Sequence, residues 1–210
     1  MKRKIVVSGR GEVRGRPDVM TVQVGVSLVR ETVGVAATEA ASLAAELVHV
    51  LQFSGVESDD IQTANYSIHP EYEHTAHRQR LVGYRVTNAL VVKIRDLEQS
   101  GAVLDAVASV AGDDVTMGGV GFEIEDDAEL VTAAREQAWN DAVAKARQLA
   151  DLAGLELGNA ISIEETVAGG GHPVARAFAM DEAVAFQSTP IETGSRAVII
   201  DLRVAFQLLD

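Results

Sequence analysis

The chain has 210 residues, of which 47% are hydrophobic and 23% are charged, a composition that supports a buried core. Its formal net charge of −13 argues against nucleic acid or an anionic membrane as a partner, because both favour Lys and Arg. The absence of Cys excludes disulfides, thiolate nucleophiles and Cys-based metal sites.

The N-terminal residues MKRKIVV carry three basic side chains but a shorter apolar run than a signal peptide needs. We find no apolar stretch of the roughly 18 residues that span a membrane. The chain as given therefore predicts no export signal and no transmembrane segment, and we expect a cytoplasmic location. A trimmed mature form leaves an extracytoplasmic location as the alternative.

In the first half, alternating apolar and polar residues predict strands at 4–8, 21–28, 61–69 and 81–94. Gly9, Gly11 and Gly15 predict turns after the first strand, and the polar segment 71–80 predicts a hairpin loop. Helices are predicted over 31–53, which Gly55 ends, and over 97–111. From residue 18 to residue 124 this order is βαββαβ, compatible with a ferredoxin-like arrangement.

In the second half, a strand weakened by glycines is predicted at 115–124, followed by a helix from Asp126 or Asp127 to about Ala153. This helix is about 40 Å long at 1.5 Å per residue. Strands follow at 161–165 and 198–206. The expected inner face of the helix is mostly alanine and comprises Ala134, Ala138, Ala142, Ala146 and Ala150, with Leu130 and Leu149.

The chain contains a similar series of elements twice. Each series is strand, helix, strand, strand, over about 18–94 and about 114–207, and Gly55 and Gly154 end the two helices. We therefore predict one α+β domain over 1–210 made of duplicated βαββ units. Its sheet is largely antiparallel, with helices packed on one face, including the long Ala-rich helix.

Residues 168–191 contain a glycine triplet, two prolines and few large apolar residues. Glycine widens backbone freedom and proline disfavours sheet pairing, so we expect a mobile or projecting segment. Phe178 and Phe186 are costly to leave in water, which favours a docking arm that inserts into a neighbouring subunit. Deletion of 170–188 is then expected to leave the protein folded but to shrink its assembly.

Three patterns are candidates for a site. Ser8-Gly9-Arg10-Gly11 has the GxG of a phosphate loop but lacks the following helix, so a backbone turn is favoured. His74 and His77, beside Glu71 and Glu73, have metal-ligand spacing but lie in the expected hairpin loop. The acidic run Glu123, Glu125, Asp126, Asp127 and Glu129 suits the start of a helix better than acid–base catalysis.

The remaining histidines, His49, His69 and His172, have no sequence partner, and no nucleophile elbow, P-loop or zinc-protease motif is present. We therefore expect no catalytic, cofactor-binding or metal-binding residues, no cofactor, and a protein that is not an enzyme. A hydrolase or metalloenzyme that uses His74 and His77 is the weakest alternative.

Several short motifs together carry a family resemblance. They are Val7-Ser8-Gly9-Arg10-Gly11-Glu12-Val13, Arg16-Pro17-Asp18, Val24-Gly25-Val26, Asp60-Ile61-Gln62-Thr63, Asn65-Tyr66-Ser67-Ile68 with Pro70 and Tyr72, Leu81-Val82-Gly83-Tyr84-Arg85 with Asn88, Ala133-Ala134-Arg135, Ala138, Ala142, Lys145-Ala146, Leu149-Ala150, Pro190-Ile191 and Gly194. On these residues the chain resembles the SIMPL-domain family, a bacterial family of unknown function that includes periplasmic and outer-membrane-associated immunogenic proteins. The resemblance implies an α+β fold and, in some members, ring-like assemblies, and it implies no catalytic residues.

Together these observations predict a non-enzymatic, self-associating scaffold or stress-related protein, with a homo-oligomer as its assembly. Two similar units present equivalent edges, which favours symmetric association. The alternative is a small-molecule binding module, since βαββ units in outline resemble those of small flavin-storing proteins.

Overall fold

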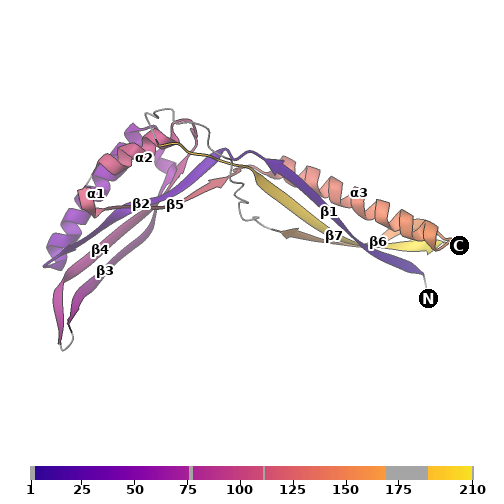
Figure 1. Cartoon of the computed structure of the whole chain (residues 1–210), viewed down its shortest axis with the longest axis horizontal. Helices are drawn as coiled ribbons and strands as arrows, with labels where there is room; N and C mark the ends of the chain where they lie inside the picture. Colours follow the sequence, from indigo (N-terminus) through magenta and orange to yellow (C-terminus); the bar gives the residue numbers. More distant parts are fainter. Residues whose placement is uncertain (1–2, 76–77, 111, 169–188, 210) are drawn as a thin grey trace, which may run out of the picture. The chain divides into compact units, whose positions relative to one another are not determined.

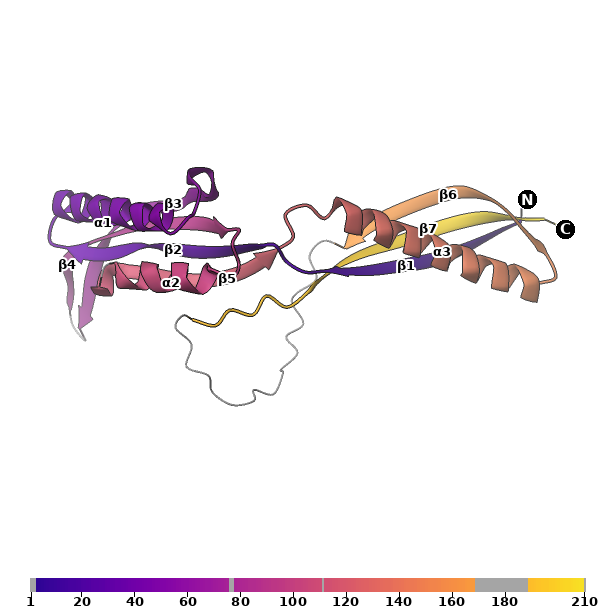
Figure 2. The ribbon, with the colours of Figure 1, turned by 90° about the horizontal axis from the view of Figure 1, so that it is seen from above.

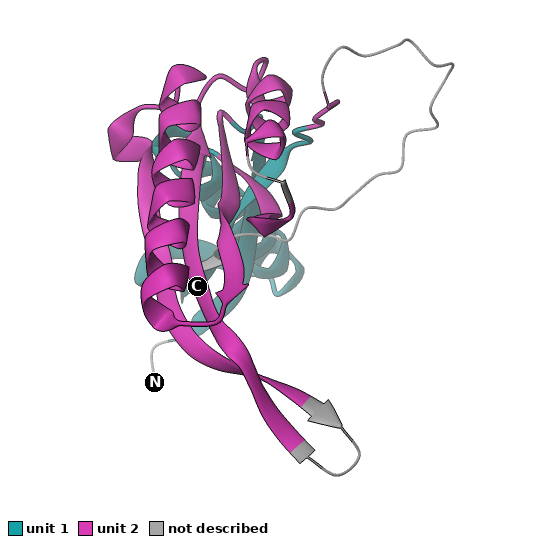
Figure 3. Cartoon of the chain, turned by 90° about the vertical axis from the view of Figure 1, so that its left-hand side faces the viewer, with its two compact units in different colours: residues 1–17, 124–179, 193–210 teal, residues 18–123, 180–192 magenta. Residues whose placement is uncertain are grey.

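The computed structural model describes residues 3–75, 78–110, 112–168 and 189–209. In these residues, three α-helices and seven strands form two antiparallel sheets, which confirms the α+β class. Where one domain was expected, the described residues form two compact units (Figure 3). Unit 1 draws on 1–17, 124–179 and 193–210, and unit 2 on 18–123 and 180–192.

Unit 2 is a four-stranded antiparallel sheet with two helices. In chain order its elements are β2 (Val19–Arg30), α1 (Val33–Phe53), β3 (Ile61–Thr75), β4 (Arg78–Ile94), α2 (Ser100–Ser109) and β5 (Val115–Glu123). The strand order β3-β4-β2-β5 is that of a ferredoxin-like βαββαβ unit, as the sequence predicts.

Both helices of unit 2 lie on one face of its sheet (Figure 2). Val22 and Val24 of β2 share a core with Leu47 and Leu51 of α1 and with Val107 of α2. Along β2 these inward residues alternate with Thr21 and Gln23, which explains why the period-2 pattern is clear. On the other face, β2 presents Thr21, Gln23, Gly25 and Ser27.

Helix α1 has clear start and stop signals. The Thr32 hydroxyl accepts a hydrogen bond from the Val35 amide (3.4 Å), and Gly55 ends the helix with φ of 89°. Contrary to the expectation from sequence, α1 is long and apolar enough to cross a membrane by length and composition. Its buried residues pack within unit 2 and are Ala36, Ala40, Ala44, Leu47 and Leu51.

The hairpin β3–β4 corrects the loop predicted at 71–80. Strand pairing continues to Thr75 and Arg78, well beyond Tyr84, where β2 stops pairing with β4 (Figure 3). Tyr72, Glu73, Gln79 and Arg80 of this extension are exposed, so its polar residues are compatible with a strand. A charged pair across the strands, Glu71 with Arg85, further supports the hairpin (2.9 and 3.1 Å).

Unit 1 is a three-stranded antiparallel sheet with one helix on its face (Figure 1). Its elements are β1 (Lys4–Gly15), α3 (Ala128–Leu152), β6 (Glu156–Ala168) and β7 (Arg196–Leu209). The strand order is β1-β7-β6. Under α3 lie the inward residues of β7, namely Ile200, Leu202, Val204 and Phe206.

The turns predicted at Gly9 and Gly11 are wrong, because both residues lie inside β1. A Cβ atom at Gly9 would meet the Ala138 carbonyl oxygen, and one at Gly11 would meet the Ala134 carbonyl oxygen. These glycines therefore let the strand approach the backbone of α3. This contact also removes the phosphate-loop interpretation of the GxG motif, since no loop is formed there.

The alanine face of α3 is confirmed. All five predicted alanines are buried, and Ala134, Ala138, Ala142 and Ala146 belong to the core of unit 1. Leu149 differs from expectation, because it is 46% exposed. The next residue, Ala150, is buried, so alanine and not leucine forms the buried face of α3 at this point.

The second βαββ series has different boundaries from the predicted 114–207. The strand at its start, β5, pairs with β2 in the sheet of unit 2 (Thr21 opposite Gly121, Val26 opposite Val115). In unit 1 the strand that precedes α3 in the sheet is β1, which pairs with β7 over its full length. The predicted duplication itself stays a prediction.

Most of the segment 168–191 lies outside the described residues, so its predicted character stays a prediction. Of this segment, Ala168 ends β6, and Thr189 is bound to α2. The Thr189 amide and hydroxyl donate to the Asp105 carboxylate, at 3.1 and 2.6 Å. Ile191 packs against the core of unit 2.

Candidate functional site

The two outer strands of the unit 1 sheet, β1 and β6, differ in how far side chains of α3 cover their outer edges. At β1, side chains of α3 bind the outward backbone groups. The Arg10 amide donates to Asp141 (2.9 Å), and Lys145 donates to the Ser8 carbonyl (3.0 Å). A hydrogen bond from Lys145 to the Asp141 carboxylate (2.6 Å) and, to a lesser extent, the bond from the Arg10 amide hold the pKa of Asp141 below its usual range. The β1 edge is thus occupied.

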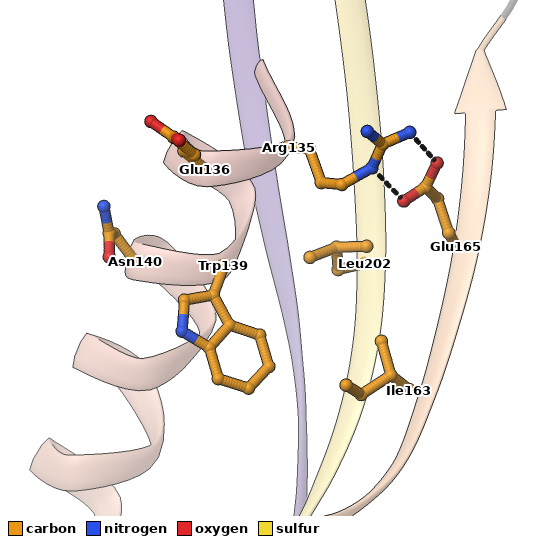
Figure 4. A pocket seen from close by; sticks show the side chains of 7 residues that line it. All are labelled: Arg135, Glu136, Trp139, Asn140, Ile163, Glu165 and Leu202. Atoms are coloured by element: carbon orange, nitrogen blue, oxygen red, sulfur yellow. Dashed lines mark hydrogen bonds and ion pairs between the residues drawn. The ribbon is translucent and has the colours of Figure 1, made fainter. Parts of the chain in front are cut away.

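At the other edge, β6 lies beside a groove that α3 leaves open. The groove has a volume of about 440 Å³. Its apolar lining is Trp139, Ile163 and Leu202, and its polar lining is Arg135, Glu136, Asn140 and Glu165 (Figure 4). Each of these residues belongs to unit 1. Because α3 packs mainly on β1 and β7, this helix leaves most of the β6 side of the sheet uncovered.

The local structure explains why these side chains meet. Arg135 and Trp139 are four residues apart on α3 and share a face. Ile163 and Glu165 are two residues apart on β6 and point to the same side of the sheet. The strand register sets Glu165 opposite Leu202. Helix and strand periodicity therefore converge on one groove.

A two-pronged ion pair crosses the groove between α3 and β6. Arg135 Nε lies 2.7 Å from Glu165 Oε2, and its second nitrogen lies 2.9 Å from Oε1. The hydrogen bonds to Arg135 lower the pKa of Glu165, and those to Glu165 raise the pKa of Arg135. Glu165 therefore stays ionised near neutral pH and is poorly suited to donate a proton.

The floor of the groove is aromatic and the β6 side is exposed. The Trp139 ring is half-buried, and its centroid lies 5.9 Å from that of Phe206. On β6, Ile161 and Ile163 are 55% and 57% exposed. Exposed β-branched residues on an edge strand are an unusual feature, because such edges invite pairing with another strand.

Unit 2 has a second cavity of about 450 Å³ beside the end of α1. Its charged groups include Asp60, which is nearly buried and binds Arg95 through two bonds (2.7 and 2.9 Å). Phe53 at the rim is 88% exposed. Because the lining of this cavity is more polar than that of the unit 1 groove, we regard the unit 1 groove as the stronger candidate for apolar contacts.

Of the other histidine candidates, His49 and His69 line neither cavity. The side chain of His74 and all of His77 and His172 lie outside the described residues. His49 on α1 and His69 on β3 are exposed. Within the part of the chain that is described, no three His, Asp or Glu residues gather in a way that suits a metal ion.

The acidic run begins α3, as expected from the sequence. Asp126 accepts a hydrogen bond from the Ala128 amide (3.1 Å), and Glu129 lies in the first turn. Sequence reasoning missed the groove itself. The sequence features that could have indicated the groove are Trp139, the only Trp of the chain, and Arg135, four residues before it.

Comparison with known proteins gives a match over both units. The sequence model of the SIMPL family, described as a protein of unknown function (DUF541), matches residues 5–206. The 26 kDa periplasmic immunogenic protein of Brucella melitensis is 28% identical over 98% of this chain and 84% of its own length. The uncharacterized protein YggE of Escherichia coli K12 is 25% identical over 76% of this chain and 64% of its own length.

Proposed function

Because the chain belongs to the SIMPL family, whose function is unknown, we propose a function from the geometry of unit 1. The protein is a non-enzymatic scaffold that associates with copies of itself through the β6 edge and its groove. A role in the stress response is a further part of this proposal that rests only on the family resemblance stated above.

One observation carries the proposal: α3 side chains bind one edge of the unit 1 sheet, whereas the other edge carries exposed apolar side chains. The β1 edge is closed by Asp141 and Lys145, whereas the β6 edge presents Ile161 and Ile163 next to an apolar groove. Proteins usually protect sheet edges with charges, bulges or covering elements. An edge with exposed isoleucines is best explained as a surface that another chain covers.

Light scattering during size exclusion tests this proposal. At micromolar concentration the wild-type protein is expected to exceed the 22.3 kDa of one chain. Ile163→Asp places a charge at the groove and is expected to reduce the mass. The matched control is Val6→Asp, on the same sheet but on β1, where Val6 is 44% exposed. A wild-type protein of monomer mass would refute the proposal.

The groove chemistry also supports a non-enzymatic role. Its only carboxylates are Glu136 and Glu165, and Glu165 is held by Arg135. Trp139, Ile163 and Leu202 offer apolar contact and no nucleophile. Residues of this kind suit binding of a surface, in which apolar contacts give affinity and the ion pair gives orientation.

We propose an extracytoplasmic location in place of the cytoplasmic one expected from sequence. The support is that relatives from Brucella melitensis and Brucella abortus are named periplasmic proteins. Fractionation of the native host, with an antibody against this protein, tests the location. Recovery with cytoplasmic markers alone would reject it.

A small-molecule binding function is the second candidate, favoured by the size of the groove. A volume of about 440 Å³ lies within the usual range for ligand pockets, and Trp139 can stack on an aromatic ligand. Because Trp139 is the only tryptophan, its fluorescence reports directly on the groove. Titration with flavin mononucleotide that leaves this fluorescence unchanged, after correction for absorbance, would remove a flavin-like ligand.

A further inference from the structure

Strand β6 can accept a further strand on its outer side, most regularly from Ser162 to Ala168, because its register with β7 shifts between Leu157 and Ser162. In the described sheet of unit 1, β6 pairs with β7 on one side only, from Glu156 opposite Leu209 to Ala168 opposite Ile199. An extended polypeptide added to such an edge gains backbone hydrogen bonds, and its alternate side chains meet the two faces of the sheet.

The two faces at β6 require different side chains from an added strand. On the α3 side, the strand meets Ile163, Leu202 and the Trp139 ring. On the opposite side, the neighbouring residues are polar, Ser162 and Glu164 of β6 with Arg203 of β7. The occupant must therefore carry large apolar residues at every second position and small or polar residues between them.

Residues 174–186 of this chain, VARAFAMDEAVAF, follow this pattern at five of their seven even positions, the other two being Arg176 and Glu182. The large apolar residues all fall at even positions and are Val174, Phe178, Met180, Val184 and Phe186. The odd positions hold five alanines and Asp181. In an extended strand, the even positions share one face and the odd positions share the other.

The length of the chain excludes pairing of the whole segment with its own β6, which favours a second copy. If 174–186 ran back along its own β6, Phe186 would lie opposite Glu156, at the Leu209 end of β7. From there to Arg196 is the length of β7, about 43 Å at 3.3 Å per residue. The ten residue steps from Phe186 to Arg196 reach at most about 35 Å. Thr189 is held on α2 as well.

We propose that residues 174–186 of a second copy add to β6 as a fourth strand, with the even-numbered apolar side chains in the groove. This inference rests on the proposed self-association and names the segment and the edge that make the contact. The groove then gains the apolar cover that α3 does not provide, and the exposed Ile163 is buried between chains.

The absence of Cys in the natural chain allows a direct test by disulfide trapping. One protein carries Ser162→Cys on the polar face of β6. A second, distinguished by a size tag, carries a single cysteine at Ala175, Ala177, Ala179, Ala183 or Ala185. After mixing and mild oxidation, at least one of these five is expected to form a tagged–untagged disulfide with Ser162→Cys on a non-reducing gel.

Matched controls use the other face and the other edge. Arg176→Cys and Glu182→Cys lie at even positions, so their sulfur atoms point to the groove side and are expected to give only background coupling. Arg10→Cys replaces Ser162→Cys on the closed edge, β1, and is also expected to give background. Circular dichroism of each variant must match the wild type before its result is counted.

Three outcomes would overturn the inference. Equal coupling at odd and even positions would show random collision. In a further protein that carries both Ser162→Cys and one of the five alanine-to-cysteine substitutions, a disulfide within one chain, with none between chains, would show that the segment covers its own β6. No coupling at any odd position in a protein that light scattering shows to be oligomeric would place the contact elsewhere and leave the self-association intact. A monomeric wild-type protein would instead refute the self-association on which the inference rests.

Discussion

Individual residues of unit 1 show how a strand and a helix can come closer than side chains normally allow. At Gly9 and Gly11 the hydrogen replaces a Cβ atom that would meet the backbone of α3. Ala138 and Ala142 provide the small side chains on the helix. The motif Ser8-Gly9-Arg10-Gly11 is thus a packing motif, in which glycine is required by space and not by a turn.

The close approach predicts the effect of adding one methyl group. Gly9→Ala is expected to destabilise the protein by about 1–3 kcal/mol, because the Cβ atom meets the backbone of α3, which cannot rotate away. Chemical denaturation followed by Trp139 fluorescence measures the change.

The control substitution is Gly34→Ala in the first turn of α1, where a Cβ atom meets nothing within 4 Å. Because alanine favours helix, this change is expected to be neutral or to stabilise by up to about 1 kcal/mol. Equal destabilisation by the two substitutions would contradict the packing argument.

The Arg135–Glu165 pair predicts a pH dependence. Its folded-state pKa at Glu165 is lowered from 4.5, so the pair contributes stability that is present above about pH 4.5 and is lost as the pH falls through the lower, folded pKa. Glu165→Gln is therefore expected to be less stable than wild type at pH 7, with a difference that shrinks in acid. Denaturation across this range measures it, and a difference independent of pH would assign the effect to packing.

At the scale of elements, α1 and α3 end in the same way. The amides of Val56 and Leu155 each donate to the carbonyl five residues before, at 3.1 and 3.0 Å. Gly55 and Gly154 both have positive φ, 89° and 69°. This is the motif in which a left-handed glycine satisfies the last carbonyls of a helix. Local sequence is sufficient to encode it, and both glycines were predicted.

The alanine face of α3 predicts different changes in stability for two alanine-to-leucine substitutions that lie two residues apart. Ala142 is fully buried against β1, so Ala142→Leu is expected to overpack the contact and cost about 1–3 kcal/mol. Ala144, on the exposed side of the same helix, is the control and is expected to change stability by less than about 0.5 kcal/mol. Urea denaturation compares them. Similar costs at the two positions would argue that helix propensity decides the effect.

At the scale of the whole molecule, the negative charge belongs almost entirely to one unit. Unit 2 contains six Lys and Arg against 18 Asp and Glu, a net charge of −12 out of −13. Unit 1 is therefore close to neutral. Repulsion between the negative charges of unit 2 in different copies favours solubility. Unit 1, which is nearly neutral, can approach another copy without a large electrostatic cost.

The charge contrast predicts different responses of the two units to salt. Screening relieves repulsion within unit 2, so raising NaCl from a low concentration to about 0.5 M is expected to raise its unfolding temperature more than that of unit 1. Trp139 fluorescence follows unit 1 alone, and far-UV circular dichroism follows both. If the fluorescence transition shifts as much as the transition of unit 2, the contrast does not govern stability.

The two units share one strand order, which bears on the predicted duplication. In unit 2, β2 pairs with β4, and β4 pairs with β3. In unit 1, β1 pairs with β7, and β7 pairs with β6. The duplication stays a prediction, with 1–15 in place of 114–123 as the first strand of the second series. Superposition of β1-α3-β6-β7 on β2-α1-β3-β4 in an experimental structure tests it.

By itself, the sequence determined the α+β class, the helices with their glycine ends, and the alanine face of α3. Each of these follows from interactions between residues close in the chain, so periodicity and caps are enough to predict them. The ferredoxin-like order of unit 2 also followed, because its strands are consecutive.

The sequence allowed the strand at 115–124 in both series, and only the tertiary structure decided that β5 belongs to unit 2 and that β1 joins α3 and β7. The pairing of β1 with β7 connects residues as far apart in the chain as Lys4 and Gln207, and the local pattern of a strand does not specify its partner. The groove has the same origin, because Trp139 and Ile163 meet only after α3 has packed against β1. A site formed by elements distant in sequence depends on how these elements pack. A short stretch of sequence does not contain that information, so it cannot predict such a site.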